Sequence, residues 1–316
     1  MKRPNRAKPL SITLHRLAQC LFMSLFMSLL LGQAWAGPLI VAHRGGTGDA
    51  PENTLPAFAE ALDHHADALW MTVQITRDGV PVLYRPADLA SLTDGHGRLD
   101  QIDFAELRKL NAGFSFGRKD AAGQLAHPYR DAPIPIPTLR EALDAVPPSV
   151  PIMLDMKQAP AAPLVEAVAK VLDETRSWQR VRLYSTDVAA TALMRAMPRA
   201  QVFESRDATR MRLVQLAMNG ACDSPPAPGT WAGIEFHRQL EVIERYTLGA
   251  GVSKVDAHWW TPAAVQCFKS RGDVHLVVFG VETPADYAAA AALGVDAVMT
   301  DSPERLAATL RTTAAK

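Results

Sequence analysis

Short apolar runs alternate with longer stretches of helical spacing along residues 37–316. The short runs are rich in Val, Ile and Leu and predict strands, whereas apolar residues three and four positions apart predict amphipathic helices. The predicted strands are residues 39–42, 68–75, 80–84, 152–156, 181–185, 201–204, 252–256, 275–281 and 297–300. The predicted helices are residues 55–62, 139–146, 164–175, 188–197, 208–218, 262–269, 284–293 and 303–310.

The repeated strand–helix unit predicts the architecture. Because it continues through residues 37–316 without a linker-like break, we expect one α/β domain folded as a (β/α)8 TIM barrel. A doubly wound open sheet is the alternative. Residues 76–79 form a turn that joins two predicted strands directly, so residues 80–84 should fold back as a hairpin. Residues 86–137 are rich in Gly, Asp and Pro and predict a small insertion after the second strand, and residues 222–233 predict a second irregular loop.

The amino-terminal segment has the composition of an export signal. Five basic residues precede an uncharged apolar run at residues 17–31, and Ala34-Trp35-Ala36 follows. This order predicts a secretory signal peptide over residues 1–36, cleaved after Ala36, and a periplasmic or secreted protein. A membrane anchor is the alternative, but the run is shorter than the about 20 residues that a spanning helix needs. We therefore expect no stable membrane span.

Charge and cysteine content narrow the range of partners. The chain carries 33 basic and 33 acidic side chains, and loss of residues 1–36 would remove five basic and no acidic ones. A mildly acidic chain is unsuited to a nucleic-acid backbone, so we expect no nucleic-acid partner. Cys222 and Cys267 would remain in a compartment where they could pair. A core of this size needs no disulfide, so the sequence leaves their pairing open.

Polar and charged residues follow most of the predicted strands. In a parallel barrel the chemistry lies at the carboxyl ends of the strands. Basic groups outnumber carboxylates at the first of these ends, which predicts an anionic ligand. Asp301, after the last strand, is expected to cap the helix that begins at Pro303. The residues expected at this rim are His43, Arg44, Trp70, Thr72, Arg85, Asp155, Lys157, His258, Glu282 and Asp301.

Six segments of the chain resemble the glycerophosphodiester phosphodiesterases. They are residues 41–45 (VAHRG), 51–54 (PENT), 76–82 (TRDGVPV), 106–113 (ELRKLNAG), 136–143 (IPTLREAL) and 294–303 (GVDAVMTDSP). The resemblance implies a (β/α)8 barrel with a small insertion. It also implies hydrolysis of glycerophosphodiesters to an alcohol and glycerol phosphate. This chemistry uses a divalent cation, often Ca²⁺, held by three carboxylates, and two histidines as general acid and base.

The resemblance assigns roles to several residues. The first histidine of the family is His43, the acid or base, beside Arg44, whose guanidinium suits a phosphate. Glu52 lies in the Pro-Glu-Asn-Thr motif and is expected to bind substrate. The family's Glu-x-Lys appears as Asp-Met-Lys at residues 155–157. It supplies one metal-binding carboxylate, Asp155, and a phosphate-binding cation, Lys157.

Three positions depart from the family pattern. The two carboxylates of its Glu-x-Asp motif fall on Trp70 and Thr72, and the second histidine falls on Arg85, which cannot exchange a proton near neutral pH. A hard dication needs several anionic oxygens, so we expect Ca²⁺ or Mg²⁺ binding to be weak or absent. Arg44, Arg85 and Lys157 would then surround a phosphate directly.

A purely structural role is the alternative for each of these residues. His43 could be a capping or core histidine, Arg44 and Lys157 could pair with neighbouring carboxylates, Trp70 could fill the volume of the lost metal shell, and Arg85 could be a solvated loop residue. Two functions are therefore possible. One is a phosphodiesterase in which cationic side chains replace the dication. The other is a catalytically silent barrel that binds a small phosphate-bearing ligand or a partner protein.

Overall fold

The computed structural model describes residues 37–119 and 122–314. The chain divides into two units, Met1–Gly37 and Pro38–Lys316, and the fold below is that of the second unit. The predicted signal peptide at residues 1–36 lies outside the described residues. Within the described part of the chain, no helix combines the length and the apolar character that crossing a membrane requires.

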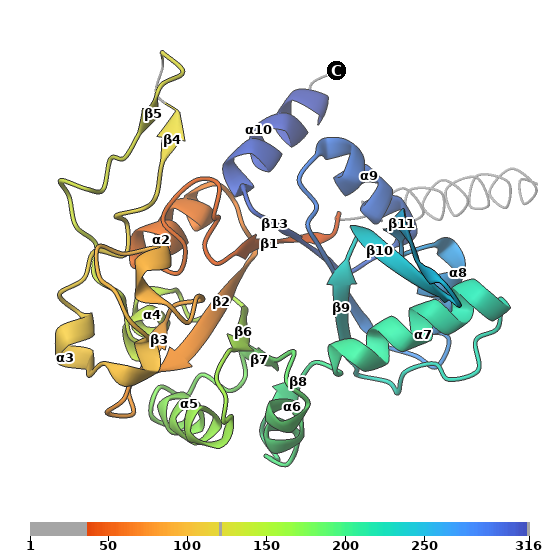
Figure 1. Ribbon diagram of the computed structural model, residues 1–316, viewed down its shortest axis with the longest axis horizontal. Helices are drawn as coiled ribbons and strands as arrows, with labels where there is room; N and C mark the ends of the chain where they lie inside the picture. The colour runs from red at the N-terminus through yellow and green to blue at the C-terminus, as the bar shows by residue number, and fades with distance from the viewer. Residues whose placement is uncertain (1–36, 120–121, 315–316) are drawn as a thin grey trace, which may run out of the picture. The chain divides into compact units, whose positions relative to one another are not determined.

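Eight parallel strands form a nearly closed ring (Figure 1). They follow one another around the ring in chain order, and the last strand pairs with the first, Leu39 opposite Ala297. The remaining gap is bridged by Phe203 and Trp231. The predicted (β/α)8 barrel is confirmed. The strands are β1 (Leu39–His43), β2 (Ala68–Ile75), β6 (Ile152–Met156), β7 (Val181–Tyr184), β8 (Gln201–Val202), β9 (Trp231–Glu235), β12 (His275–Phe279) and β13 (Ala297–Thr300).

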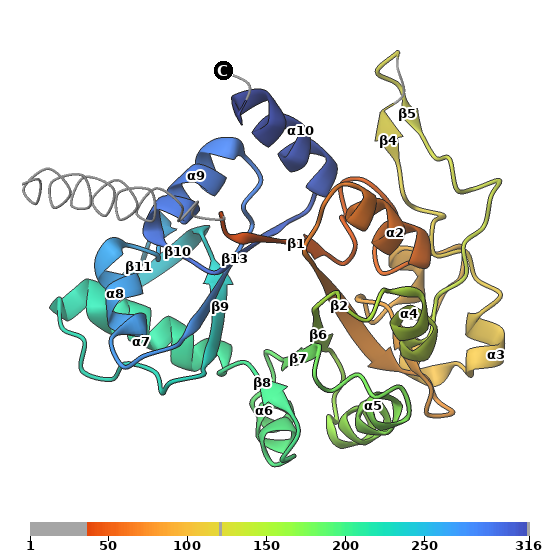
Figure 2. The ribbon, with the colours of Figure 1, turned by 180° about the vertical axis from the view of Figure 1, so that it is seen from behind.

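One helix follows each strand and lies outside the ring (Figure 2). Threonine side chains cap several of these helices: Thr54, Thr138 and Thr283 each accept a hydrogen bond from a backbone N–H in the first turn. The helices are α2 (Leu55–Asp63), α4 (Leu139–Ala145), α5 (Ala162–Glu174), α6 (Val188–Arg195), α7 (Arg206–Asn219), α8 (Pro262–Lys269), α9 (Pro284–Leu293) and α10 (Pro303–Ala314).

The core has two layers because successive side chains of a strand point to opposite faces. On β2, Leu69 and Met71 belong to the layer between the strands and the helices. Trp70 belongs to a separate cluster with residues from the other barrel strands, among them Tyr184 and Phe279. This inner cluster fills the barrel and forms the floor beneath the carboxyl ends of the strands.

The segment after β2 has a small core of its own. β3 (Pro81–Leu83) runs antiparallel to β2, which confirms the predicted hairpin. Buried side chains of Tyr84, Leu99 and Ile136 hold the following loops together. The remaining short elements are η1 (Leu89–Ser91), η2 (Leu99–Gln101), α3 (Phe104–Leu107), β4 (Arg118–Lys119) and β5 (Leu125–Ala126).

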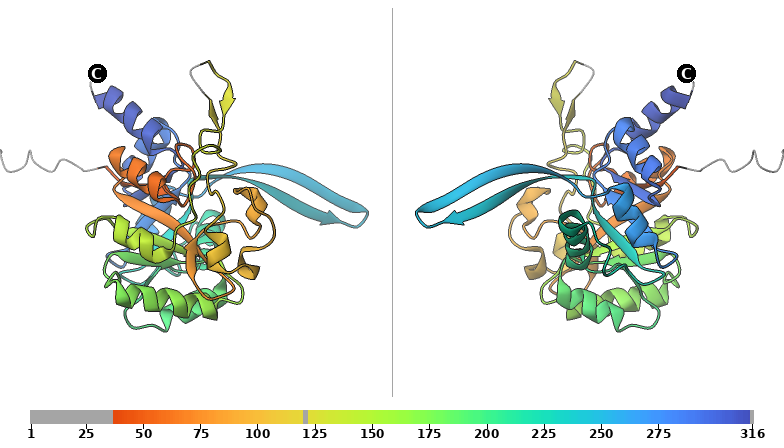
Figure 3. Two further views of the ribbon diagram at one scale, coloured as in Figure 1. Left: turned by 90° about the vertical axis from the view of Figure 1, so that its left-hand side faces the viewer. Right: turned by 90° about the vertical axis from the view of Figure 1, so that its right-hand side faces the viewer.

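The seventh predicted strand is wrong. Residues 252–256 lie in β11 (Gly249–His258), which pairs only with β10 (His237–Tyr246) in an exposed antiparallel hairpin (Figure 3). The barrel strand at this place is β9, part of which was assigned to an irregular loop. The error has a physical reason: β9 follows a proline-rich stretch and contains Gly233, whereas residues 252–256 contain the β-branched Val252 and Val255, which occur in an exposed ribbon as well as in a barrel strand.

Cys222 and Cys267 are joined by a disulfide bond. It links the loop that precedes β9 to helix α8. The sequence had left this pairing open.

Candidate active site

A cavity of about 310 Å³ opens at the carboxyl ends of the barrel strands. The cavity brings together six of the residues predicted for the rim, His43, Arg44, Arg85, Asp155, Lys157 and Asp301, with Trp70 in its wall. Three further rim predictions, Thr72, His258 and Glu282, do not line it, and neither does Glu52. The full lining is His43, Arg44, Trp70, Arg85, Asp155, Lys157, Tyr184, Thr186, Arg206, Glu235, Phe279, Gly280, Met299 and Asp301.

His43, at the end of β1, faces Asp301, which follows β13. The His43 Nδ1 atom lies 2.5 Å from Asp301 Oδ1. Burial raises the pKa of the Asp301 carboxyl, but hydrogen bonding and the charge of His43 outweigh this, and the pKa falls below its ordinary value. An ionised Asp301 fixes the proton of the neutral imidazole on Nδ1, which leaves Nε2 as the proton acceptor.

Asp301 is itself held in place by a second carboxylate. Glu282 Oε1 accepts a hydrogen bond of 2.8 Å from the backbone N–H of Asp301, and Oε2 accepts one from the Thr300 hydroxyl. The prediction that Asp301 caps α10 is wrong. Ser302 does so, because its Oγ accepts the backbone N–H of Arg305 at 3.2 Å. Asp301 is therefore available for His43.

Arg44 is positioned by a tight turn after β1. Its φ is +52°, and the next residue, Gly45, has a φ of +85° where a Cβ would lie 2.8 Å from the Cβ of Ala57. Only glycine fits there, which explains the Arg-Gly pair in the sequence. Arg44 Nη1 donates to Glu52 Oε2 at 2.6 Å, so the motif glutamate orients Arg44. Arg44 therefore forms the ion pair with Glu52 and also lines the cavity.

Asp155 is the carboxylate that the family resemblance assigns to the metal-binding set. It is buried, which raises the pKa of its carboxyl above the ordinary value, although Lys157, Arg44 and His43 oppose the rise. Lys157 Nζ lies 3.5 Å from Asp155 Oδ1 and donates to the Thr186 hydroxyl at 3.0 Å. The ammonium group of Lys157 thus lies between the buried Asp155 carboxylate and Thr186 in the cavity wall.

The sequence did not reveal four polar residues of the cavity, Thr186 and the three described next. Tyr184 closes β7, Glu235 closes β9, and Arg206 begins α7. Arg206 Nη2 donates to Glu235 Oε1 at 2.6 Å, which neutralises both charges. Glu235 escaped notice because β9 was not recognised as a barrel strand. Tyr184 could have been found, since it lies at the end of a correctly predicted strand.

Comparison with known proteins decides the family. The sequence profile of the Glycerophosphoryl diester phosphodiesterase family matches residues 43–305. The chain belongs to the glycerophosphoryl diester phosphodiesterase family. It is 48% identical over 266 residues to the uncharacterized protein Rv2277c of Mycobacterium tuberculosis, which covers 84% of this chain and 87% of that protein.

Solved structures of the family share the fold. The glycerophosphoryl diester phosphodiesterase domain of Rv2277c is 46% identical, with a TM-score of 0.79 over 87% of this chain and 99% of that one. The phosphodiesterase of Oleispira antarctica, solved with sn-glycerol-3-phosphate, has a TM-score of 0.62 at 19% identity, over 87% of this chain and 97% of that one. A glycerophosphodiester phosphodiesterase of rat is 42% identical over 103 residues, which is 33% of this chain and 28% of that one.

Trp70 takes the place of the first carboxylate of the family's Glu-x-Asp motif. Its side chain is only 3% exposed. The indole packs against Tyr184 at a centroid distance of 4.9 Å, Phe279 at 5.2 Å and Phe203 at 6.2 Å. An apolar cluster occupies this side of the cavity, so the packing role of Trp70 is the one that the structure shows.

The polar atoms around Asp155 do not fit the family's dication. Thr72 lies opposite Asp155 on the adjacent strand, and its Oγ1 and Asp155 Oδ1 are buried without a hydrogen-bond partner among the described residues. Arg44 Nε and Asn53 Nδ2 are likewise buried and unpartnered in this part of the chain. A dication would have one carboxylate and a neutral hydroxyl as ligands and would meet N–H donors. We therefore derive no chemistry through a metal.

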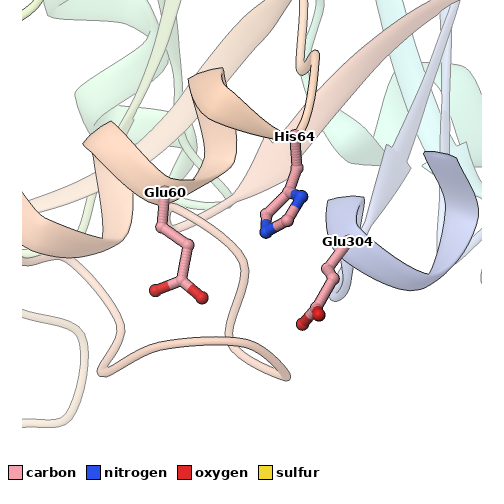
Figure 4. A group of neighbouring side chains, drawn as sticks. All are labelled: Glu60, His64 and Glu304. Atoms are coloured by element: carbon pink, nitrogen blue, oxygen red, sulfur yellow. The ribbon is translucent and has the colours of Figure 1, made fainter. Parts of the chain in front are cut away.

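A second group of potential metal ligands lies outside the cavity. Glu60 and His64 of α2 and Glu304 of α10 each offer a ligand atom within 4.8 Å of the others (Figure 4). Burial raises the pKa of Glu60 above its ordinary value, whereas Arg118 opposes the rise. None of the three residues lines the candidate active site.

Proposed function

We propose that this protein hydrolyses glycerophosphodiesters to an alcohol and glycerol phosphate with cationic side chains in place of the family's dication. The observation that carries the proposal is the His43–Asp301 pair, which shares one cavity with Arg44, Arg85 and Lys157. The family membership supports the substrate class. The mixture of one oriented base and several cations is what transfer of a phosphoryl group requires.

Arg85 and Lys157 could both reach a bound phosphate, but their surroundings differ. Arg85 is exposed, and none of the described carboxylates lies within ion-pair distance of it. Lys157 is half-buried, and its Nζ lies 3.5 Å from Asp155 Oδ1 and donates to the Thr186 hydroxyl. Together with Arg44 they would bind the phosphoryl oxygens and offset the charge that develops on them in the transition state. Arginine is suited to this role because its guanidinium donates two parallel hydrogen bonds.

His43 would act as the general base. Its Nε2 would take a proton from the attacking hydroxyl, either of water or of the neighbouring glycerol group, and Asp301 would stabilise the resulting imidazolium. The P–O bond to the head-group alcohol then breaks, and the departing alkoxide would take a proton from water, because His43 is the one histidine in the described cavity wall. The hydroxide left behind would take the proton from His43, which restores the base. Attack by water gives glycerol phosphate directly, whereas attack by the glycerol hydroxyl gives a cyclic phosphate that a water molecule would open in a second step, with His43 again as the base.

Product release from glycerophosphocholine and glycerophosphoethanolamine tests the proposal. The purified protein should turn over in EDTA as fast as in Ca²⁺ or Mg²⁺. Arg85→Ala should lower kcat/KM by about 10- to 100-fold, the effect of one charged hydrogen bond of about 1.5–3 kcal/mol. Arg210→Ala is the matched control, since Arg210 is an exposed arginine of α7 outside the cavity. Activity that is lost in EDTA and restored by Ca²⁺ would contradict the proposal.

A silent barrel that binds a phosphate-bearing ligand is the second candidate. The replacement of the second catalytic histidine by Arg85 favours it, because the change removes an acid and adds a permanent positive charge. Absence of turnover with and without metal, combined with retained phosphate binding, would identify this function.

Glycerol phosphate should stabilise the protein without metal. At 100 times its dissociation constant a ligand adds about 2.7 kcal/mol to the free energy of unfolding, which a thermal melt resolves. The shift should shrink strongly in Arg85→Ala and stay unchanged in Arg210→Ala, whereas Ca²⁺ alone should shift none of the three proteins. Equal shifts in wild type and Arg85→Ala would show that Arg85 does not contact the phosphate.

We also propose that the protein works outside the cytoplasm after cleavage of residues 1–36. The Cys222–Cys267 disulfide supports this location, because structural disulfides form in oxidising compartments. Amino-terminal sequencing of the exported protein, expected to begin near Gly37, tests the proposal.

A further inference from the structure

The β10–β11 hairpin extends from the barrel as a lone two-stranded ribbon (Figure 3). Its ten residue pairs run from His237 opposite His258 at the base to Tyr246 opposite Gly249 at the tip. The base is anchored, since His237 Nε2 lies 3.2 Å from Asp286 Oδ1 of α9. A two-stranded ribbon alone is marginally stable in water. We therefore expect a hairpin of this length to be stabilised by pairing with a further strand or by packing against another surface.

The outer part of the hairpin carries large apolar side chains that nothing in the described chain covers. Their exposed fractions lie between 43% and 99%. Val242, Tyr246 and Val255 lie on one face of the ribbon, and Ile243 and Val252 lie on the other. Scattered single residues of this kind are normal, whereas several gathered on one short ribbon mark an interaction site. The residues are Val242, Ile243, Tyr246, Leu248, Val252 and Val255.

Both edges of the ribbon are open for pairing. Tyr246 and Gly249 close a two-residue turn, which makes them a pair that exchanges backbone hydrogen bonds. The pattern alternates along an antiparallel ladder, so on β10 the residues Glu241, Ile243 and Arg245 direct their N–H and C=O groups to the open edge. Unpaired edge groups of this kind are a template for another strand.

We propose that two copies of this chain associate through their β10 strands, paired antiparallel about a two-fold axis at Ile243. In this register Glu241 lies opposite the partner's Arg245, and Arg245 opposite the partner's Glu241. Leu240 lies opposite the partner's Tyr246. The charges are thus complementary, and the apolar residues meet on the same faces of a four-stranded sheet.

Neighbouring registers on the same edge are unfavourable. Moving the axis by two residues toward the base places Glu241 opposite the partner's Glu241. Moving it by two residues toward the tip places Arg245 opposite the partner's Arg245. Like charges directly opposite one another destabilise a sheet. Among the axes at Glu241, Ile243 and Arg245, the charges of β10 therefore favour the one at Ile243.

Two alternatives are less favourable than pairing through β10: pairing through the edge of β11, and insertion of the hairpin into a membrane. On β11, Lys254 could face the partner's Asp256, but that axis lies three residues from the base at His258, about 10 Å, which leaves little room for two barrels. The Ile243 axis lies six residues from His237, about 20 Å from each barrel. A lipid core would leave the open backbone edge unpaired and would meet Glu244 and Arg245 near the tip.

Cysteine cross-linking tests the register. Ile243→Cys should form a covalent dimer on mild oxidation, because the two copies of residue 243 face each other across the axis within reach of a disulfide. Val252→Cys is the matched control: it lies opposite Ile243 in the hairpin but three strand spacings, about 14 Å, from its own counterpart. Equal cross-linking of both variants, or of neither, would overturn the proposal, and so would a cross-link at Val255→Cys alone.

Charge exchange tests the pairing without cysteine. Sedimentation of the wild-type chain at about 0.1 mM should show a dimer, and Glu241→Arg should raise its dissociation constant about tenfold or more. The double variant Glu241→Arg with Arg245→Glu should restore the dimer, because it exchanges the signs but keeps them complementary. A monomeric wild type, a double variant no better than the single one, or dissociation of the dimer on binding to anionic lipid vesicles would each overturn the proposal.

Discussion

Asp301→Asn should lower kcat/KM for glycerophosphodiesters by about 10²- to 10⁴-fold at neutral pH. An amide cannot stabilise the imidazolium, and it can present either a donor or an acceptor to His43 Nδ1, so the imidazole loses its fixed tautomer. Because the pKa of Asp301 lies below its ordinary value, the wild-type carboxylate stays ionised into the acidic range. The deficit of the variant should therefore persist across the pH range in which the wild-type Asp301 carboxyl is ionised. A pH–rate profile of both proteins measures this.

Asp296→Asn is the control for that experiment. Asp296 lies just before the other end of β13, where it accepts a hydrogen bond from the backbone N–H of Leu276 and pairs with Lys269. Its loss should affect the unfolding temperature and leave the shape of the pH profile unchanged. If Asp301→Asn kept wild-type activity, His43 would not be the base, and the proposed chemistry would fail with it.

The triple variant Trp70→Glu, Thr72→Asp and Arg85→His should gain Ca²⁺ binding and metal-dependent hydrolysis. Trp70 and Thr72 lie on one face of β2, and Thr72 is opposite Asp155, so three carboxylates would converge. Without Ca²⁺ the variant should be less stable by about 3–5 kcal/mol, because the large indole leaves the inner cluster. Ca²⁺ at 100 times its dissociation constant should return about 2.7 kcal/mol. Thermal melts with and without Ca²⁺ measure both effects.

An uncharged counterpart separates the metal site from the loss of packing. Trp70→Gln, Thr72→Asn and Arg85→His have nearly the same shape as the triple variant but lack the two new carboxylates. This protein should be destabilised to a similar degree and should not respond to Ca²⁺. A folded carboxylate variant that also ignores Ca²⁺ would mean that further positions around the site have changed.

The sequence predicted the barrel because regular burial leaves a regular pattern. Each inner strand other than β9 showed its apolar run, and Thr–Pro pairs marked the starts of α8 and α9. β9 was not predicted because a short strand with a glycine has little pattern of its own, whereas Val252 and Val255 give β11 the residue types of a strand. Pattern reveals that a segment is extended but not which sheet it joins.

The sequence predicted those site residues that lie within a short local motif. His43, Arg44 and Lys157 were found because local sequence carries them to the cavity. The partner of His43 was not, since Asp301 lies 258 residues away and its distance to the helix start suggested a cap. The Arg206–Glu235 pair likewise joins the start of α7 to the end of β9, 29 residues further along the chain. Pairings that depend on ring closure leave no local signal.

The pairing of β1 with β13 has a consequence for biosynthesis. His43 leaves the ribosome early and Asp301 almost last, and the two meet only when the first and last strands come together. A nascent, truncated or unfolded chain therefore has the cations of the cavity but no oriented base. Under the proposed function, catalytic competence would therefore appear only once the first and last strands have paired.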